Sequence, residues 1–146
     1  MPSLLKTSIL CLVPVAAVLA ANTQISTDKP IVNFRLPAFT PEGHRAWLVR
    51  GSEARFANEN QIGIKELTLS VFSGGADEKV ETLILSPTAE VHPAEAVITG
   101  PGSIRVINDQ FEAGGLSWRY EHKSKKVSIG RKVRVTFRAE FKDYLK

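Results

Sequence analysis

The sequence has few of the residues that carry most protein chemistry. Its 146 residues include one Cys, three His and a net charge of only +4, from 19 basic and 15 acidic side chains. A single Cys excludes an internal disulfide framework, and no Cys/His pair has the spacing of a zinc site. No Ser lies in a nucleophile elbow, and the charge is too small to indicate a nucleic-acid-binding protein. We therefore expect no enzyme activity, metal, cofactor or nucleic-acid partner.

The first 21 residues have the pattern of an export signal. Lys6 precedes an apolar run over residues 9–21, which ends in small residues. The run has 13 residues and contains Pro14, whereas a membrane span needs about 20 apolar residues. We predict a cleaved signal peptide over 1–21, with an uncleaved membrane anchor as the alternative, and a linker over 22–30.

From Ile31 onward, apolar residues recur mostly at every second position, which is the period of a β-strand. Strands with one apolar and one polar face are typical of antiparallel sheets. Turn signals follow at short intervals: Pro41-Glu42-Gly43, Asn58-Glu59-Asn60, Gly74-Gly75, Ser86-Pro87, Gly100-Pro101-Gly102, Asn108-Asp109, Gly114-Gly115 and Lys123-Ser124-Lys125. This pattern predicts an all-β sandwich, jelly roll or barrel of about ten strands over residues 31–141, followed by a short tail over 142–146.

Two segments of the chain resemble each other. Gly43-x-x-x-Trp47 is followed by Ile62-x-Ile64, and Gly114-x-x-x-Trp118 is followed by Val127-x-Ile129. A repeated hairpin unit, stacked on its neighbours, would build an elongated twisted sheet. The alternative is a chance match, because all alternating segments share a two-residue period.

Basic residues gather at the C-terminal end. Residues 115–146 contain ten basic and three acidic side chains, a net charge of +7. These cations can line the solvent face of a terminal edge strand, where they discourage aggregation. Alternatively, they attract the phosphate groups of anionic lipids.

Strand parity predicts which side chains face the interior of the fold. This inward set comprises Phe34, Trp47, Leu67, Leu69, Val71, Leu83, Leu85, Ile104, Val106, Leu116, Trp118, Val127, Ile129, Val133, Val135 and Phe137. These residues either fill an ordinary core or line an apolar trough, in which a lipid acyl chain would gain about 0.8 kcal/mol per buried methylene. The sequence leaves both possibilities open.

Several spaced residues resemble the LptC family of periplasmic lipopolysaccharide-export proteins, which shares its β-repeat with the OstA-like bridge protein LptA. The similarity spans Val32 to Phe137 and rests on alternation and spaced glycines. The matching motifs are Phe34-x-Leu36-x-x-Phe39-x-x-x-Gly43-x-x-x-Trp47, Ala54, the Ile64–Phe72 strand, Ser86-Pro87-x-Ala89, Gly100-x-Gly102-x-Ile104, Gly115-x-x-Trp118 and Val133-x-Val135.

This resemblance implies an elongated, open-ended, twisted antiparallel β-jelly roll in the periplasm. Its interior would receive the acyl chains of lipid A, delivered by an inner-membrane ABC transporter complex. The roll would pass lipopolysaccharide to another β-jelly-roll protein through edge-strand pairing, and it would catalyse no bond chemistry. The inward set would then be the lipid-binding residues. The alternative function is a secreted structural or ligand-binding β-sandwich with a filled core.

Overall fold

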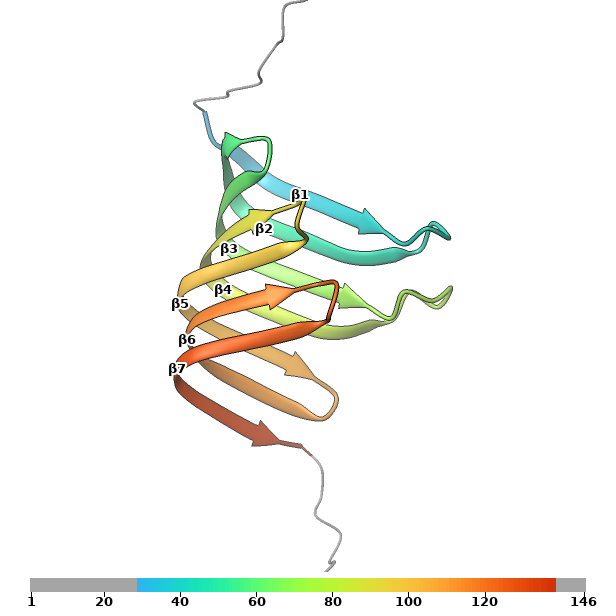
Figure 1. The fold of residues 1–146 in the computed structure, drawn as a ribbon, viewed down its shortest axis with the longest axis vertical. Coiled ribbons are helices and arrows are strands. Elements are labelled where there is room, and N and C mark those ends of the chain that lie inside the picture. The colour runs from blue at the N-terminus through green and yellow to red at the C-terminus, as the bar shows by residue number, and fades with distance from the viewer. Residues whose placement is uncertain (1–28, 139–146) are drawn as a thin grey trace, which may run out of the picture.

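A computed structural model describes residues 29–138, which form seven strands and no helix. The strands are β1 (Ile31–Phe39), β2 (Arg45–Asn58), β3 (Gln61–Phe72), β4 (Val80–His92), β5 (Val97–Asn108), β6 (Phe111–Glu121) and β7 (Lys126–Phe137) (Figure 1). Within this part of the chain, no helix has the length and hydropathy to cross a membrane. The predicted signal peptide or anchor over 1–21, residues 22–28 of the linker and the tail over 142–146 lie outside the described residues.

All seven strands belong to one sheet, in the order in which they occur along the chain. Each strand pairs antiparallel with the next, from β1–β2 to β6–β7. β1 and β7 are the two edges, so the sheet does not close on itself. The prediction of an all-β, elongated and open-ended antiparallel jelly roll is confirmed.

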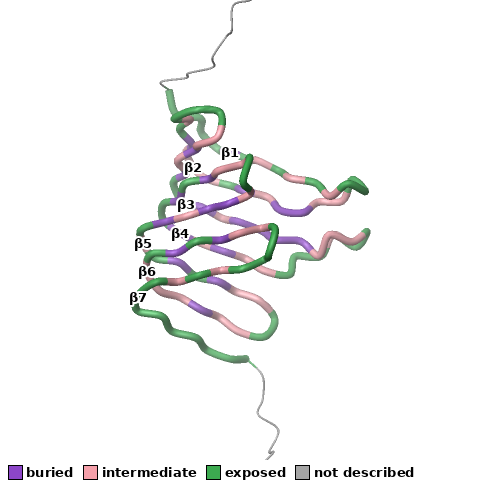
Figure 2. The backbone as a smooth tube through the Cα atoms, in the orientation of Figure 1, coloured by how far each residue is buried: buried purple, intermediate pink, exposed green. Residues whose placement is uncertain are grey.

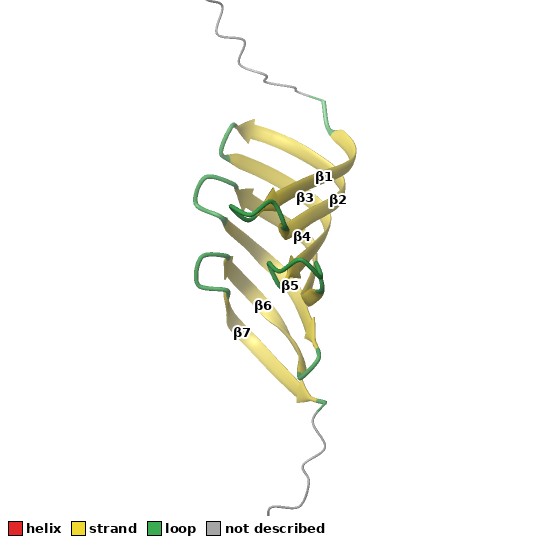
Figure 3. Ribbon diagram, turned by 90° about the vertical axis from the view of Figure 1, so that its right-hand side faces the viewer, coloured by secondary structure: helices red, strands yellow, loops and turns green. Residues whose placement is uncertain are grey.

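The strands are long and bent near their middle, so that the two halves of a strand lie in different layers (Figures 1 and 3). The turns at 40–44, 73–79 and 109–110 form one row, and we call the adjoining strand halves the first layer. The turns at 59–60, 93–96 and 122–125 form the other row, beside the second layer. The bends join the two layers on one side of the sheet, and the turns lie on the other side (Figure 1).

The bends of neighbouring strands lie in a line because paired strands bend at positions that face each other. Ladder pairs on either side place Glu66 of β3 opposite Pro87 of β4. Four non-glycine residues within strands have positive φ values, which occur where a β-bulge turns the strand. They are Asn33 (54°), Glu66 (52°), Ser117 (58°) and Lys132 (49°).

The structure has seven strands rather than the expected ten because three turn signals lie at bends instead of turns. Ser86-Pro87, Gly100-Pro101-Gly102 and Gly114-Gly115 lie inside β4, β5 and β6. Glycine and proline favour a corner within a strand as readily as a reversal of the chain. Glycine and proline therefore occur both at bends within strands and at turns between strands, and the sequence does not distinguish the two.

The predicted duplication is correct in one part and wrong in another. A Cβ on Gly51 would collide with Ile64, and a Cβ on Gly115 would collide with Ile129. These pairs therefore occupy equivalent places at two bends, as the match of Ile64 with Ile129 predicts. The match of Trp47 with Trp118 is wrong, because Trp47 precedes the bend of β2 whereas Trp118 follows the bend of β6.

The core lies between the two layers (Figure 2). Directly paired residues share a face of the sheet, so the pair Leu69 and Ile84 points inward from adjacent strands, and both side chains are fully buried. The other large side chains that are almost fully buried include Val49, Ile64, Leu67, Val91, Ile98 and Ile104.

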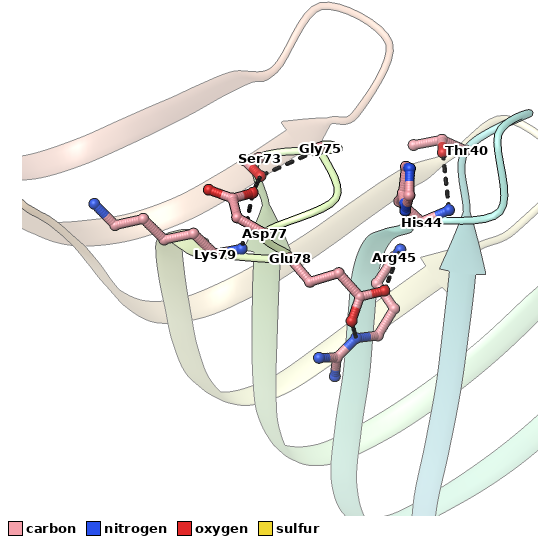
Figure 4. Close-up of polar contacts among 8 residues, drawn as sticks. All are labelled: Thr40, His44, Arg45, Ser73, Gly75, Asp77, Glu78 and Lys79. Atoms are coloured by element: carbon pink, nitrogen blue, oxygen red, sulfur yellow. Dashed lines mark hydrogen bonds and ion pairs between the residues drawn. The ribbon is translucent and has the colours of Figure 1, made fainter.

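Polar contacts join neighbouring turns along the first row (Figure 4). The Glu78 carboxylate accepts hydrogen bonds from the Arg45 backbone N–H at 3.2 Å and from Arg45 Nε at 3.0 Å. These bonds hold the pKa of Glu78 below its ordinary value. Within the second of these turns, Ser73 Oγ donates to Asp77 at 2.7 Å. The Arg45–Glu78 contact holds the first two hairpins of this row beside each other.

The second row of turns has its own link. Asn60 accepts a hydrogen bond from the backbone N–H of Ala94 at 2.8 Å and donates from Nδ2 to the Glu95 carboxylate at 2.7 Å. The backbone N–H of His122 then donates to the Ala96 carbonyl at 3.0 Å. The three turns of this row are thereby connected from 59–60 to 122–125.

Candidate functional site

The N-terminal part of the interior is filled by side chains. Phe34 and Phe56 meet edge to face, with ring centroids 5.9 Å apart. Ala54, Ile62 and Ile64 are buried to 2% exposure or less in the same part of the sheet. This end is an ordinary packed core.

At the C-terminal end the layers leave a groove of about 480 Å³, a volume within the range of small-molecule sites. Its apolar lining residues are Val71, Val106, Phe111, Ala113, Tyr120, Val127, Ile129, Val133 and Val135, and its polar ones are Glu81, Thr82, Asn108 and Lys125. The first-layer halves of β3 to β7 form one wall, and the second-layer halves of β6 and β7, with the turn between them, form the other.

Strand register brings these residues to one face. Val106 pairs with Ala113, which in turn pairs with Val135 on the edge strand. Val106 and Ala113 are 3% and 7% exposed and form the floor of the groove. Val133 and Val135 are 53% and 44% exposed, because no strand among residues 29–138 pairs with the outer side of β7. The groove is therefore open along β7.

One ion pair spans the rim of the groove. Lys125 Nζ in the β6–β7 turn lies 3.6 Å from Glu81 Oε2 at the start of β4, and both side chains are about half exposed, at 51% and 49%. Lys125 belongs to the second row of turns, whereas Glu81 belongs to the first layer. The pair therefore joins the two layers at the opening of the groove.

Three aromatic side chains are in contact beside the groove, and one of them, Tyr120, lines it. The His122 ring lies 6.2 Å from the Trp47 ring of the opposite layer, and its Nδ1 is 2.9 Å from the hydroxyl of Tyr120. Burial raises the pKa of Tyr120 to about 12. Burial, and after it the charge of Lys125, lowers the pKa of His122 below 6.5. The neutral forms of both groups are thus favoured, which suits a hydrogen bond between them.

The structure places thirteen of the sixteen predicted interior residues on the inner face. Those in the packed core or on the groove floor are Phe34, Trp47, Leu67, Leu69, Val71, Ile104, Val106 and Trp118, and those toward the open edge are Val127, Ile129, Val133, Val135 and Phe137. Phe137 is 62% exposed and pairs with Phe111 at the end of β7. Contact of these residues with lipid stays a prediction.

The inward placement of Leu83 and Leu85 is wrong. Leu83 pairs with Ser70 and Ile107, and Leu85 pairs with Thr68 and Arg105, on the face opposite Ile84. The run Leu83-Ile84-Leu85 has no alternation, so its sequence does not show which parity faces inward.

The inward placement of Leu116 is also wrong. It pairs with the exposed residues Ser103 and Arg131, one position beyond Gly115, whose partner Ile104 is buried. Ser117 has a positive φ of 58°, which interrupts the alternation of β6, so Trp118 lies on the inner face although it is two positions beyond Leu116. A single break in the alternation reverses the parity of every residue beyond it.

Sequence reasoning missed several residues of the groove. Tyr120 lies two positions after Trp118 in the same strand, so alternation could have predicted that it faces the interior. Glu81, Thr82, Asn108 and Lys125 carried no such signal, because they lie at strand ends and in a turn. Their proximity depends on how the layers cross.

Among residues 29–138, no group of three or more His, Cys, Asp or Glu side chains could hold a metal ion. No protein-family model matches the sequence, and no curated protein matches it.

Proposed function

We propose that this protein is a periplasmic lipid carrier or bridge in lipopolysaccharide export. Acyl chains of lipid A enter the groove at the C-terminal end of the roll, and the carrier passes them toward the outer membrane without catalysing bond chemistry. The proposal combines the resemblance to the LptC family with the geometry of the groove.

The observation that carries this proposal is an apolar groove open along an edge strand. A water-exposed trough that includes Val133 and Val135 is costly unless something apolar occupies it. An acyl chain there would gain about 0.8 kcal/mol for each methylene removed from water.

The two unpaired edges support the proposed partners. In the part of the chain that the structure describes, β1 and β7 each have one side of their backbone without a neighbouring strand, which is the surface that edge-strand pairing uses. In this proposal, one edge meets the inner-membrane ABC transporter complex and the other meets the next β-jelly roll.

The filled N-terminal core favours a second candidate function. Phe34 and Phe56 leave little room there for an acyl chain, as a secreted structural or ligand-binding β-sandwich would require. In that case the groove is a surface feature and takes up no lipid.

Photocrosslinking to purified lipopolysaccharide distinguishes the two. A photoreactive residue replaces Val135, which lines the groove, in one sample, and the neighbouring Thr136, whose side chain alternates to the other face, in a matched control. The carrier function predicts adducts at 135 and few at 136. No adduct at 135, in a protein with the circular dichroism of the unmodified chain, would favour the filled-core module.

A further inference from the structure

The groove has an apolar floor and a charged rim, which is the arrangement that an amphiphile requires. Within the described residues, Lys125 is the one cation that lines it, and Glu81 is the one anion. An acyl chain on the floor would place its headgroup near this pair. The rim charges therefore affect which headgroups the groove accepts.

Positive charge dominates the segment to which Lys125 belongs. Residues 122–137 form the β6–β7 turn and β7, and they contain six basic residues and no acidic residue, a net charge of +6. Such a field raises the local concentration of anions and opposes cations. It favours Lys125 over Glu81 as the contact for a headgroup.

The backbone holds Lys125 in place. Its N–H donates to the His122 carbonyl at 3.1 Å, and the His122 N–H donates to the Ala96 carbonyl at 3.0 Å. The residue itself has a positive φ of 48° at the end of the turn. A cation on an anchored turn loses less conformational entropy on binding than one on a free loop.

We infer that Lys125 binds the anionic headgroup of an amphiphile whose chain lies in the groove, and that Glu81 is the counter-ion this headgroup displaces. The inference rests on the proposed function, since it needs an acyl chain in the groove. The chemical class of the headgroup is a phosphate or a carboxylate, both of which accept charge-assisted hydrogen bonds from an ammonium group.

Two substitutions at the rim should act in opposite directions. Lys125→Gln should weaken binding of dodecyl phosphate by about three- to tenfold, because a half-exposed charge pair contributes modestly. Glu81→Gln should strengthen it by about two- to fivefold, because the competing carboxylate is gone. Neither change should alter binding of the uncharged dodecyl maltoside.

The experiment is calorimetric titration of the full chain with both amphiphiles below their micelle concentrations. Dodecanoate serves as a third probe, which separates a general preference for anions from a preference for phosphate. Lys123→Gln is the matched control, because Lys123 belongs to the same turn but does not line the groove. It should leave the affinity within about twofold of the unmodified protein.

Each outcome decides the inference. Opposite effects of the two rim substitutions on an anionic probe support it. The inference is overturned if both variants change the affinity for anionic and uncharged probes equally and in the same direction. The ion pair would then only hold the two layers together at the opening of the groove. Unchanged affinities in both variants overturn it but leave the proposed function standing. Failure of the unmodified protein to bind any of the three probes overturns both.

Discussion

At the scale of single residues, Ser86 is the buried hydroxyl that joins three strands at the bend. Its Oγ lies 2.7 Å from the Ser103 carbonyl and 2.9 Å from the Thr88 carbonyl, and it accepts a hydrogen bond from Trp118 Nε1 at 3.3 Å. The side chain is 5% exposed. Trp118 is 3% exposed, so its indole N–H would be left buried without an acceptor if the hydroxyl were removed.

We expect Ser86→Ala to lower the free energy of unfolding by about 1–3 kcal/mol, because a buried indole N–H would lose its acceptor. Urea denaturation followed by tryptophan fluorescence measures the change. The exposed Ser103 uses only its backbone carbonyl in this network, so Ser103→Ala is the control and should change stability by less than about 0.5 kcal/mol. Equal effects in the two variants would contradict this role for the hydroxyl.

At the scale of strands, the bends depend on glycines that admit large neighbours. Gly100 in β5 is buried, and a Cβ there would run into the indole ring of Trp118 in β6. Trp118 packs against this backbone, and its position in turn sets how closely the layers approach at the bend. The sequence predicted a turn at Gly100, because a glycine required for close packing cannot be distinguished in the sequence from one required for a chain reversal.

Gly100→Ala should destabilise the protein by about 1–3 kcal/mol, since the added methyl overpacks the Trp118 site. Gly63→Ala in β3 is the comparison, because the nearest atom to its new Cβ would be the Arg55 carbonyl oxygen at 3.9 Å. That change should be neutral or stabilising by about 0.4–1 kcal/mol, through reduced entropy of the unfolded chain. Thermal denaturation of the two variants provides the test, and a Gly63→Ala loss as large as that of Gly100→Ala would refute the packing argument.

At the scale of the whole molecule, the contact between Trp47 and His122 joins the two layers. Residues far apart in the chain meet here because the strand halves of the two layers cross (Figure 1). The interior is packed around Phe34 and Phe56, whereas it is open beside β7.

This contact predicts a pH dependence of stability. Because the folded-state pKa of His122 lies below its ordinary value of 6.5, the unfolded chain binds a proton more readily than the folded one. The contribution of His122 to the free energy of unfolding is complete above about pH 6.5. It decreases as the pH falls toward the lowered pKa of the folded state. Urea unfolding at pH 7.5 and pH 5.5 should show lower stability at pH 5.5, and His122→Gln should reduce that difference. A His44→Gln control should retain it, and an unchanged difference in His122→Gln would assign the effect to other groups.

Much of the fold was predictable from local pattern. Alternation from Ile31 onward predicted antiparallel strands, and parity placed residues such as Leu69, Val106 and Val135 correctly on the inner face. Parity failed at Leu83 and Leu85, where three consecutive apolar residues share no alternation, and at Leu116, beside the positive φ of Ser117. A break in the alternation at a bend changes the face of the following residues without changing the residue types that a sequence displays.

The sequence by itself determined the all-β class, the antiparallel pairing and most of the inner face, because the two-residue period of a strand is a local property of the chain. Tertiary structure alone decided which end of the interior is filled and which is hollow. It also decided that Glu81 and Lys125 meet, 44 positions apart in the sequence. Both outcomes depend on the angle at which bent strands cross, which is set by packing between layers rather than by any segment on its own.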